Sequence, residues 1–307
     1  MTPAPIALFV YDRPAHTRQA VETLRLNSLA GSSELHVFSD GPRTPASAAK
    51  VREVREYLKS VDGFAKLTVY ERDRNFGLAA SVIDGVSRLC ESAGQVIVVE
   101  DDLLVAPHFL DYMNAALDRY RNETEAMQVS GYMFPVDMGA STDSFFLPFT
   151  TSWGWGTWAR AWEAFDPLMP GFDALSADRQ LRDAFNLHGA YDYYGMLRCQ
   201  QRGEVDSWAI RWYLSVFMHK GLTLYPAKTL VHNTGFDGSG THCGAGGFAQ
   251  ATGVPDFQVL SFPQQVALYA QWRRVLAGFP KRGNSLRNLA EPFLKRVNRA
   301  FGTRSGN

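Results

Sequence analysis

Three consecutive carboxylates, Glu100-Asp101-Asp102, are the strongest candidates for chemistry in this sequence. They directly follow the apolar run at residues 95–99, which is typical of a buried strand. Adjacent carboxylates repel one another unless a cation compensates their charge. Mg²⁺ and Mn²⁺ prefer oxygen ligands, and one or two carboxylates suffice when phosphates supply the rest. The triplet therefore indicates a metal–diphosphate site, with a solvated loop that caps a helix as the alternative.

The segments that must position this triplet alternate between strand and helix signals. Apolar runs at residues 6–10, 35–38, 67–70, 95–99 and 127–130 predict strands, and apolar residues recur at helical spacing between them. Strands separated by such stretches need crossover connections. The sequence therefore predicts an α/β fold with a mostly parallel sheet and helices on both faces.

Two other predicted strands also end in polar residues. Asp12-Arg13 follows the first strand and Asp40 follows the second. Because ligands of parallel sheets bind beyond the carboxyl ends of the strands, we expect these side chains and the acidic triplet to lie along one rim.

The second half of the chain differs in composition, since residues 153–212 hold six of the seven tryptophans. Trp158 and Trp162 are four residues apart, and we interpret them as core residues on one helix. The segment WGWG at residues 153–156 contains two glycines, which allow close approach of the backbone to a ligand. Sugar rings stack on aromatic side chains, so this segment is interpreted as lining a donor or acceptor cleft.

A glycine-rich segment at residues 233–247 is interpreted as a lid that excludes water, with a passive connection as the alternative. His232 and His242 flank it. Both are candidates for contacts with the metal or diphosphate, because neutral imidazole is a common metal ligand. We interpret His188 and His219 as structural.

Charge and cysteine content exclude several classes of protein. Lys plus Arg and Asp plus Glu each total 31, so a sequence-wide basic field is absent and no nucleic-acid partner is expected. The three scattered cysteines indicate neither a disulfide framework nor a zinc site and fit a reducing cytoplasm.

No apolar stretch reaches 18 residues, so no membrane span is predicted. From residue 273 onward, basic and apolar residues interleave, which predicts either a peripheral contact with the inner membrane face or a helix packed on its own domain.

Several segments resemble, in order and spacing, the donor domain of the N-acetylglucosaminyltransferase I family. They are PIALFVYDRPAHTRQAVETL, HVFSDG and VIVVEDDLLVAPHFLDYM. A looser resemblance runs through SWGWGTWARAWEAFD and VDSWAIRW to YPAKTLVHNTG, so that it covers roughly residues 4–235. The chain is also similar to a broad set of bacterial sugar transferases. The resemblance implies the GT-A fold, a nucleotide-sugar donor, a divalent metal and transfer with inversion.

The resemblance also implies roles for the residues at the rim. Asp102 matches the carboxylate that binds Mn²⁺ or Mg²⁺, Asp101 matches a ribose contact, and Glu100 faces the donor sugar. Arg13 and Asp40 match residues that hold the uracil-ribose portion, where an Arg donates to a carbonyl and a carboxylate accepts from the uracil N–H. Without the resemblance, a surface salt bridge would be the simpler interpretation of Arg13 and a turn that of Asp40.

Four further residues complete the predicted donor site: Tyr11, Asn75, Trp153 and Gly154. Tyr11 belongs to the loop of Arg13, and Asn75 opens the loop Asn75-Phe76-Gly77. A plain turn is the alternative for that second loop.

Asp206 is the candidate catalytic base that takes the proton of the acceptor hydroxyl. Val205-Asp206-Ser207-Trp208 resembles the tryptophan-flanked aspartate of the family, although Val205 stands where the family has an aromatic residue. Glu204 is the second candidate for the base. An N-cap for a helix over residues 207–219 is the structural alternative for Asp206.

Together these features predict a cytoplasmic, metal-dependent inverting glycosyltransferase. Residues 1–140 would bind a UDP-linked donor such as UDP-GlcNAc, residues 141–270 would bind the acceptor and carry the base, and residues 271–307 would form a basic amphipathic helical tail. The expected acceptor is a glycan or lipid-linked glycan of bacterial surface polysaccharide synthesis. The alternatives are a nucleotidyltransferase and a nucleotide-sugar-binding protein without turnover. Nucleotidyltransferases usually carry a glycine-rich loop after the first strand, and residues 11–14 contain no glycine.

Overall fold

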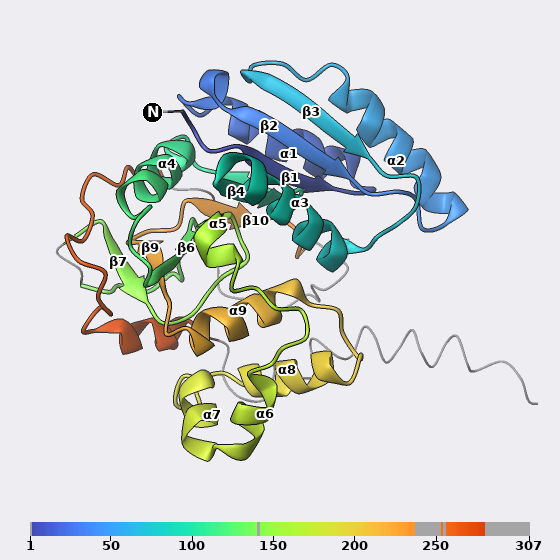
Figure 1. Cartoon of the computed structure of the whole chain (residues 1–307). Coiled ribbons are helices and arrows are strands. Elements are labelled where there is room, and N and C mark those ends of the chain that lie inside the picture. Colours follow the sequence, from blue (N-terminus) through green and yellow to red (C-terminus); the bar gives the residue numbers. More distant parts are fainter. Residues whose placement is uncertain (1, 140–141, 237–252, 254–255, 280–307) are drawn as a thin grey trace, which may run out of the picture.

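The computed structural model of the 307-residue chain describes residues 2–139, 142–236, 253 and 256–279 (Figure 1). Most of the glycine-rich segment, His242 and the tail beyond residue 279 lie outside the described residues. The predicted lid and the predicted membrane contact of the tail therefore stay predictions. Among the described residues, no helix has both the length and the apolar character needed to cross a lipid bilayer.

Within the described residues, a central sheet has the strand order β3-β2-β1-β4-β8-β6-β9-β7. Its strands are β1 (Ile6–Val10), β2 (Glu34–Ser39), β3 (Lys66–Glu71), β4 (Gln95–Glu100), β6 (Ala126–Ser130), β7 (Ser144–Leu147), β8 (Trp155–Trp158) and β9 (Leu222–Pro226). The pairs β1·β2, β2·β3, β1·β4 and β6·β9 are parallel, whereas β7 and β8 run antiparallel to their neighbours. The predicted mixed α/β architecture with a mostly parallel sheet is confirmed.

Helices cover both faces of this sheet. They are α1 (Pro14–Arg25), α2 (Pro45–Leu58), α3 (Leu78–Ala93), α4 (Phe109–Arg119), α5 (Ala159–Trp162), α6 (Phe172–Ala177), α7 (Arg179–Phe185), α8 (Tyr193–Gln201) and α9 (Trp208–Met218), with short 3₁₀ turns at Ala30–Ser32 and Trp272–Gly278. In Figure 1, α3 and α5 lie in front of the sheet and α1 lies behind it. The helix α3 packs against α5 and α9. All five residues of β1 are buried, because helices cover both of its faces and leave no side exposed to water.

The tryptophan segment corrects one prediction. Trp158 does not lie on a helix with Trp162, because it ends β8, which is inserted antiparallel between β4 and β6. Gly156 is a strand residue, and a Cβ at this position would lie 3.0 Å from Met113 and from the backbone oxygen of Val96. The glycine therefore serves sheet packing, and the predicted role of this residue in lining a cleft stays a prediction. Trp158 and Trp162 are both buried, as expected of core residues.

A second, two-stranded sheet pairs β5 (Leu103–Val105) antiparallel with β10 (Val231–Asn233). Leu103 is paired with Asn233, so the residues that precede β5 lie next to those that follow β10. This ribbon brings a segment from late in the chain to the acidic triplet after β4.

Candidate active site

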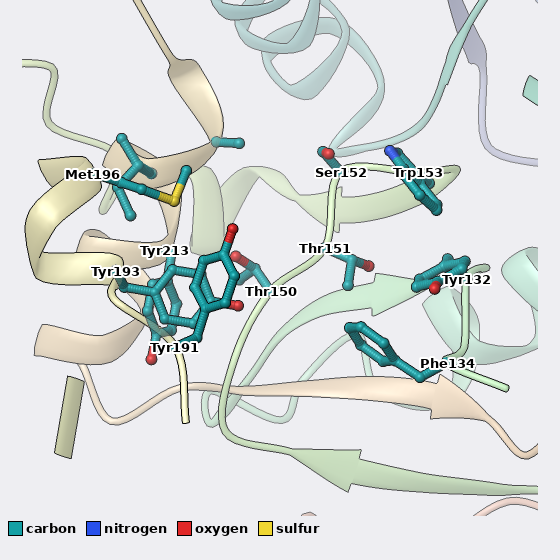
Figure 2. A pocket seen from close by; sticks show the side chains of 12 residues that line it. Tyr132, Phe134, Thr150, Thr151, Ser152, Trp153, Tyr191, Tyr193, Met196 and Tyr213 are labelled. Atoms are coloured by element: carbon teal, nitrogen blue, oxygen red, sulfur yellow. The ribbon is translucent and has the colours of Figure 1, made fainter. Parts of the chain in front are cut away.

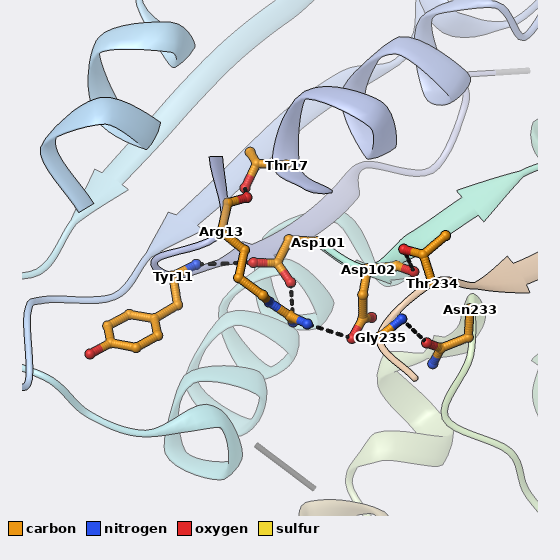
Figure 3. Close-up of polar contacts among 8 residues, drawn as sticks. All are labelled: Tyr11, Arg13, Thr17, Asp101, Asp102, Asn233, Thr234 and Gly235. Atoms are coloured by element: carbon orange, nitrogen blue, oxygen red, sulfur yellow. Dashed lines mark hydrogen bonds and ion pairs between the residues drawn. The ribbon is translucent and has the colours of Figure 1, made fainter. Parts of the chain in front are cut away.

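An ion-paired cluster occupies the carboxyl ends of β1 and β4 (Figure 3). The guanidinium of Arg13 bridges Asp101 and Asp102, and its Nη1 lies 3.1 Å from Oδ2 of Asp102. Asp101 also accepts a hydrogen bond of 3.3 Å from the backbone N–H of Tyr11 through Oδ2. The side chain of Arg13 is 20% exposed and that of Asp102 is 10% exposed. The structure thus brings together three residues that the sequence predicted to share one rim.

Burial and charge repulsion determine the protonation of this cluster. Burial, and secondarily the neighbouring Asp102, raise the pKa of Asp101 to about 7, although the facing Arg13 opposes the shift. Burial and the two neighbouring aspartates also raise the pKa of Glu100 well above its usual range. Desolvation lowers the pKa of Arg13, but the facing carboxylates outweigh this effect and raise it overall. The cluster therefore needs positive charge, and in this structure Arg13 supplies it.

The segment that follows β10 closes over Asp102 (Figure 3). The backbone N–H and the hydroxyl of Thr234 both donate to the backbone oxygen of Asp102, at 2.8 Å and 2.9 Å. A Cβ on Gly235 would lie 2.4 Å from Oδ2 of Asp102 and 3.1 Å from the side-chain oxygen of Asn233. The missing side chain at residue 235 therefore keeps space free beside two oxygen atoms from distant parts of the chain.

One oxygen of Asp102 has the character of a metal ligand. Its Oδ1 is buried and has no hydrogen-bond partner among the described residues. A buried carboxylate oxygen without a partner is costly, so a cation at this oxygen would compensate it. The described residues contain no group of three or more His, Cys, Asp or Glu side chains arranged to hold a metal. The fit is therefore to a cation that takes few ligands from the protein and the others from phosphate and water.

Asp40 organises the neighbouring loop. Its Oδ1 accepts from the backbone N–H groups of Gly41 and Phe76, and its Oδ2 accepts from the backbone of Gly77 and the side-chain amide of Asn75. These four bonds, of 2.8–3.0 Å, hold the turn before α3 against the end of β2. The bond from Gly41 agrees with the turn that was the structural interpretation of Asp40, whereas its bonds to the separate loop at residues 75–77 were not indicated by the sequence. The contacts of Asp40 and Asn75 with a nucleoside stay predictions.

Tyr11 lies on the same rim and is also bonded within the protein. Its hydroxyl donates to Oγ of Ser47 and accepts from the backbone N–H of Arg43, both at 3.1 Å. These contacts join the Arg13 loop to the N-terminus of α2. The predicted contact of Tyr11 with the donor is not tested by them.

The candidate base Asp206 lies immediately before α9. Its side chain is 67% exposed, and Oδ1 accepts a 2.7 Å ion-paired hydrogen bond from the buried Arg211. Ser207, and not Asp206, caps the helix, because its side chain accepts from the backbone N–H of Ile210. Glu204, the second candidate, is exposed and paired with Arg202. Asp206 is therefore free of the capping role that was its structural alternative.

An aromatic cavity of about 150 Å³ adjoins the start of α9 (Figure 2). Its lining includes the predicted residue Trp153. Gly154 has a φ of +58°, and its Cβ position lies 2.6 Å from Val231 and 3.2 Å from Phe109. Packing and backbone conformation thus explain this glycine, while a donor contact at Gly154 stays a prediction. Sequence patterns did not select the tyrosines of the cavity as site residues. They placed residues 233–235 at the start of the predicted lid, next to the metal candidate His232, but the contacts of this turn with Asp102 required the tertiary structure.

The two histidines that were interpreted as structural, His188 and His219, each contact an oxygen atom of a nearby residue. Nδ1 of His188 lies 3.0 Å from Asp183, and Nδ1 of His219 lies 2.8 Å from the backbone oxygen of Ser215. His232 lies on β10, paired with Leu104. A contact of His232 with a metal stays a prediction.

No protein-family model matches the sequence, and no curated protein matches it. Three solved structures share part of its arrangement. A mannosyltransferase from Pyrobaculum calidifontis, in complex with GDP-mannose and Mn²⁺, is 13% identical, with 72% of this chain and 74% of that chain covered and a TM-score of 0.37. TarS from S. aureus is 12% identical, with a TM-score of 0.41. The match covers 75% of this chain but only 36% of TarS.

The third structure comes from Desulfovibrio desulfuricans G20 and is assigned as a nucleotide-diphospho-sugar transferase. It is 13% identical, with 54% of this chain and 68% of that chain covered and a TM-score of 0.35. Because all three scores are below 0.5, we draw no functional conclusion from these likenesses. The resemblance to the N-acetylglucosaminyltransferase I family stays a prediction.

Proposed function

We propose that this protein is a metal-dependent inverting glycosyltransferase that moves a sugar from a nucleotide-sugar donor, with UDP as the nucleotide, to a hydroxyl of a glycan acceptor. The observation that carries the proposal is the buried, unpartnered Oδ1 of Asp102 at the carboxyl end of β4. It lies where ligands of parallel sheets bind and beside a cationic side chain, Arg13. A site of this kind suits an anion that arrives with a divalent cation, such as a nucleotide diphosphate.

Asp102 would hold the metal through Oδ1. Its other oxygen, Oδ2, and the side-chain oxygen of Asn233 both border the Cβ position of Gly235. When bound, Mn²⁺ or Mg²⁺ would neutralise charge on the departing diphosphate. Arg13 would orient the donor at this rim, and Asp40 would keep the loop at residues 75–77 in place for the nucleoside. The protein thus supplies an ordered binding rim and fixed charges before the donor arrives.

Asp206 would accept the proton of the acceptor hydroxyl while that oxygen attacks the anomeric carbon from the face opposite the diphosphate. Its exposure lets it reach a substrate, and its bond with Arg211 keeps the carboxylate oriented. One displacement with one base inverts the anomeric configuration. Arg211 is a positioning residue in this proposal, because it touches the base and not the substrate.

The decisive experiment is calorimetric titration of UDP in the presence and absence of Mn²⁺, on the wild type and on Asp102→Asn. We expect the wild type to bind UDP more tightly with Mn²⁺, and the variant to lose this metal-dependent gain. Asp62→Asn is the matched control, because Asp62 is 84% exposed and paired only weakly with Arg25. Equal metal dependence in the wild type and Asp102→Asn would overturn the assignment of the metal site.

A second measurement separates the classes of enzyme. Incubation with UDP-sugars and Mn²⁺ should release UDP, whereas a nucleotidyltransferase would release pyrophosphate from a nucleoside triphosphate and a sugar 1-phosphate. Binding of UDP-sugars without release of either product would favour a binding protein without turnover.

A further inference from the structure

The aromatic cavity beside α9 is built from four separate segments of the chain (Figure 2). Its lining residues are Tyr132, Phe134, Thr150, Thr151, Ser152, Trp153, Tyr191, Tyr193, Met196, Ala209, Ile210 and Tyr213. In Figure 2, the strip at residues 150–152 runs between a group of tyrosines on one side and Tyr132, Phe134 and Trp153 on the other. The rings are packed on one another, since Tyr193 and Tyr213 have centroids 4.5 Å apart and Tyr132 and Trp153 likewise. The cavity is therefore a rigid site whose walls exist before any ligand binds.

The position of the cavity connects the two predicted ends of the reaction. On one side, Trp153 contacts Phe236 at a centroid distance of 5.6 Å, and Phe236 follows Gly235, which borders Asp102. On the other side, Ala209 lies on the first turn of α9, three residues after Asp206. The cavity thus adjoins both the segment that follows Gly235 and the helix that begins after Asp206.

The lining favours a sugar over a hydrocarbon chain. Aromatic faces stack on the C–H faces of a pyranose ring, and tyrosines add a polar tip to an apolar body. The side-chain hydroxyls of Thr150, Ser152 and Tyr193 make no hydrogen bond within the described residues, although each lines the cavity. An alkyl chain cannot form hydrogen bonds with these three hydroxyls, whereas the hydroxyl groups of a sugar can both donate to them and accept from them.

We propose that this cavity is the acceptor subsite and binds the pyranose ring that carries the attacking hydroxyl. The proposal rests on the proposed glycosyltransferase function and names the substrate class of its second site. The ring would stack on the aromatic walls and bond to the three hydroxyls, which would hold one of its own hydroxyls toward Asp206.

The test is saturation-transfer-difference NMR with irradiation of the aromatic protons of the protein. The probes are the methyl glycosides of β-D-glucose, β-D-galactose, α-D-mannose and N-acetyl-β-D-glucosamine, together with hexyl β-D-glucopyranoside. We expect ring C–H protons of at least one methyl glycoside to gain saturation from the wild type. Ala209→Phe fills the cavity and should reduce that signal about tenfold, as expected when an occupied pocket excludes its ligand.

Ala174→Phe is the matched control, because Ala174 is exposed on α6 and does not line the cavity. It should keep the signal of the wild type. Tyr193→Phe tests the same site without a change in volume and should weaken binding about threefold, since one hydrogen bond is lost. This second variant keeps the proposal testable if the larger phenylalanine impairs folding.

The proposal is overturned if no glycoside gains saturation, if Ala209→Phe keeps the full signal, or if only the alkyl protons of the hexyl glycoside respond. The UDP titration of the wild type separates this result from the proposed function. UDP binding without any glycoside signal would reject the acceptor subsite alone. Glycoside binding without UDP binding would support a sugar site and reject the proposed donor.

Discussion

The acidic rim and the aromatic cavity are built by different forces. At the rim, Arg13 meets two carboxylates, and most other contacts are hydrogen bonds to backbone groups of adjacent turns. In the cavity, apolar rings from distant segments pack on one another, and Tyr213 donates its hydroxyl to the backbone oxygen of Phe185. Ion pairs therefore stabilise the acidic rim, whereas packing of buried aromatic side chains stabilises the cavity.

This difference has a consequence for ligand binding. The contacts of Arg13 can be exchanged for contacts with a donor and its cation, because a phosphate offers the guanidinium the same charge-assisted hydrogen bonds and the cation would compensate the carboxylates. The cavity cannot reorganise in the same way, since dense packing resists changes in volume. We therefore expect Arg13 to exchange its partners on a rim whose loops stay in place, and the cavity to select its ligand by shape.

The largest expected effect is at the proposed base, which precedes the helix that lines the cavity. Asp206→Asn removes the proton acceptor and should lower the transfer rate about 10³-fold, a typical contribution of general base catalysis. Binding of UDP with Mn²⁺ should stay at the level of the wild type, because Asp206 lies on the cavity side. Initial rates of UDP release in the presence of acceptor, together with calorimetry, measure both.

Glu204→Gln is the control for this prediction. Glu204 is close in sequence and exposed, and Arg202 pairs with it. It should change the rate little. A large loss of transfer in Glu204→Gln with full activity in Asp206→Asn would exchange the two roles.

Next in size is the effect of Gly235→Ala, which tests the rim. The new Cβ would lie 2.4 Å from Oδ2 of Asp102, so the carboxylate or the turn at residues 233–235 must move. Overpacking of this kind costs about 1–3 kcal/mol, which corresponds to a loss of about 5- to 150-fold in metal-dependent UDP affinity. Gly31→Ala is the control, because nothing lies within 4 Å of its Cβ position. Unchanged UDP affinity in Gly235→Ala would show that the space beside Asp102 has no part in donor binding.

The rim was predictable from the sequence because its signals are local. A buried apolar run followed by carboxylates fixes the end of β4, and the periodic spacing before and after it fixes the helices that cover the sheet. Parallel topology then places Arg13 and the triplet on the same edge. The ion pair between Arg13 and both aspartates could not be read from the sequence, because it depends on side-chain directions at two separate loops.

The cavity and β8 were not predictable for the opposite reason. Four segments that are far apart in sequence form the cavity, and no local pattern shows that they converge. The segment at residues 155–158 combines tryptophans with a glycine, and only its two neighbouring strands make it a strand. Asp40 is an intermediate case, since its position was predicted correctly but its three hydrogen bonds to the loop at residues 75–77 required the tertiary structure.

Asp40→Ala should have a smaller effect, and mainly on stability. The variant leaves three backbone N–H groups and the amide of Asn75 without their charged acceptor. Hydrogen bonds to charged groups contribute about 1.5–3 kcal/mol, so the free energy of unfolding in urea should fall by about 2 kcal/mol. Asp73→Ala, at an exposed position of the same region, should change it little. If both variants are equally stable, the loop does not depend on this carboxylate.

The smallest expected effect is at the cap of α9, and it tests whether the cavity side tolerates small changes. Ser207→Ala removes the side-chain acceptor of the Ile210 N–H, which should lower the free energy of unfolding by about 1 kcal/mol. The helix also carries Ala209 and Ile210 into the cavity, so a frayed first turn would weaken glycoside binding as well. Ser207→Thr keeps a capping hydroxyl and should restore both quantities. Because Asp102 does not line the cavity, UDP binding should not respond to either variant. A loss of UDP affinity in Ser207→Ala would mean that the two regions are coupled more tightly than their separate construction indicates.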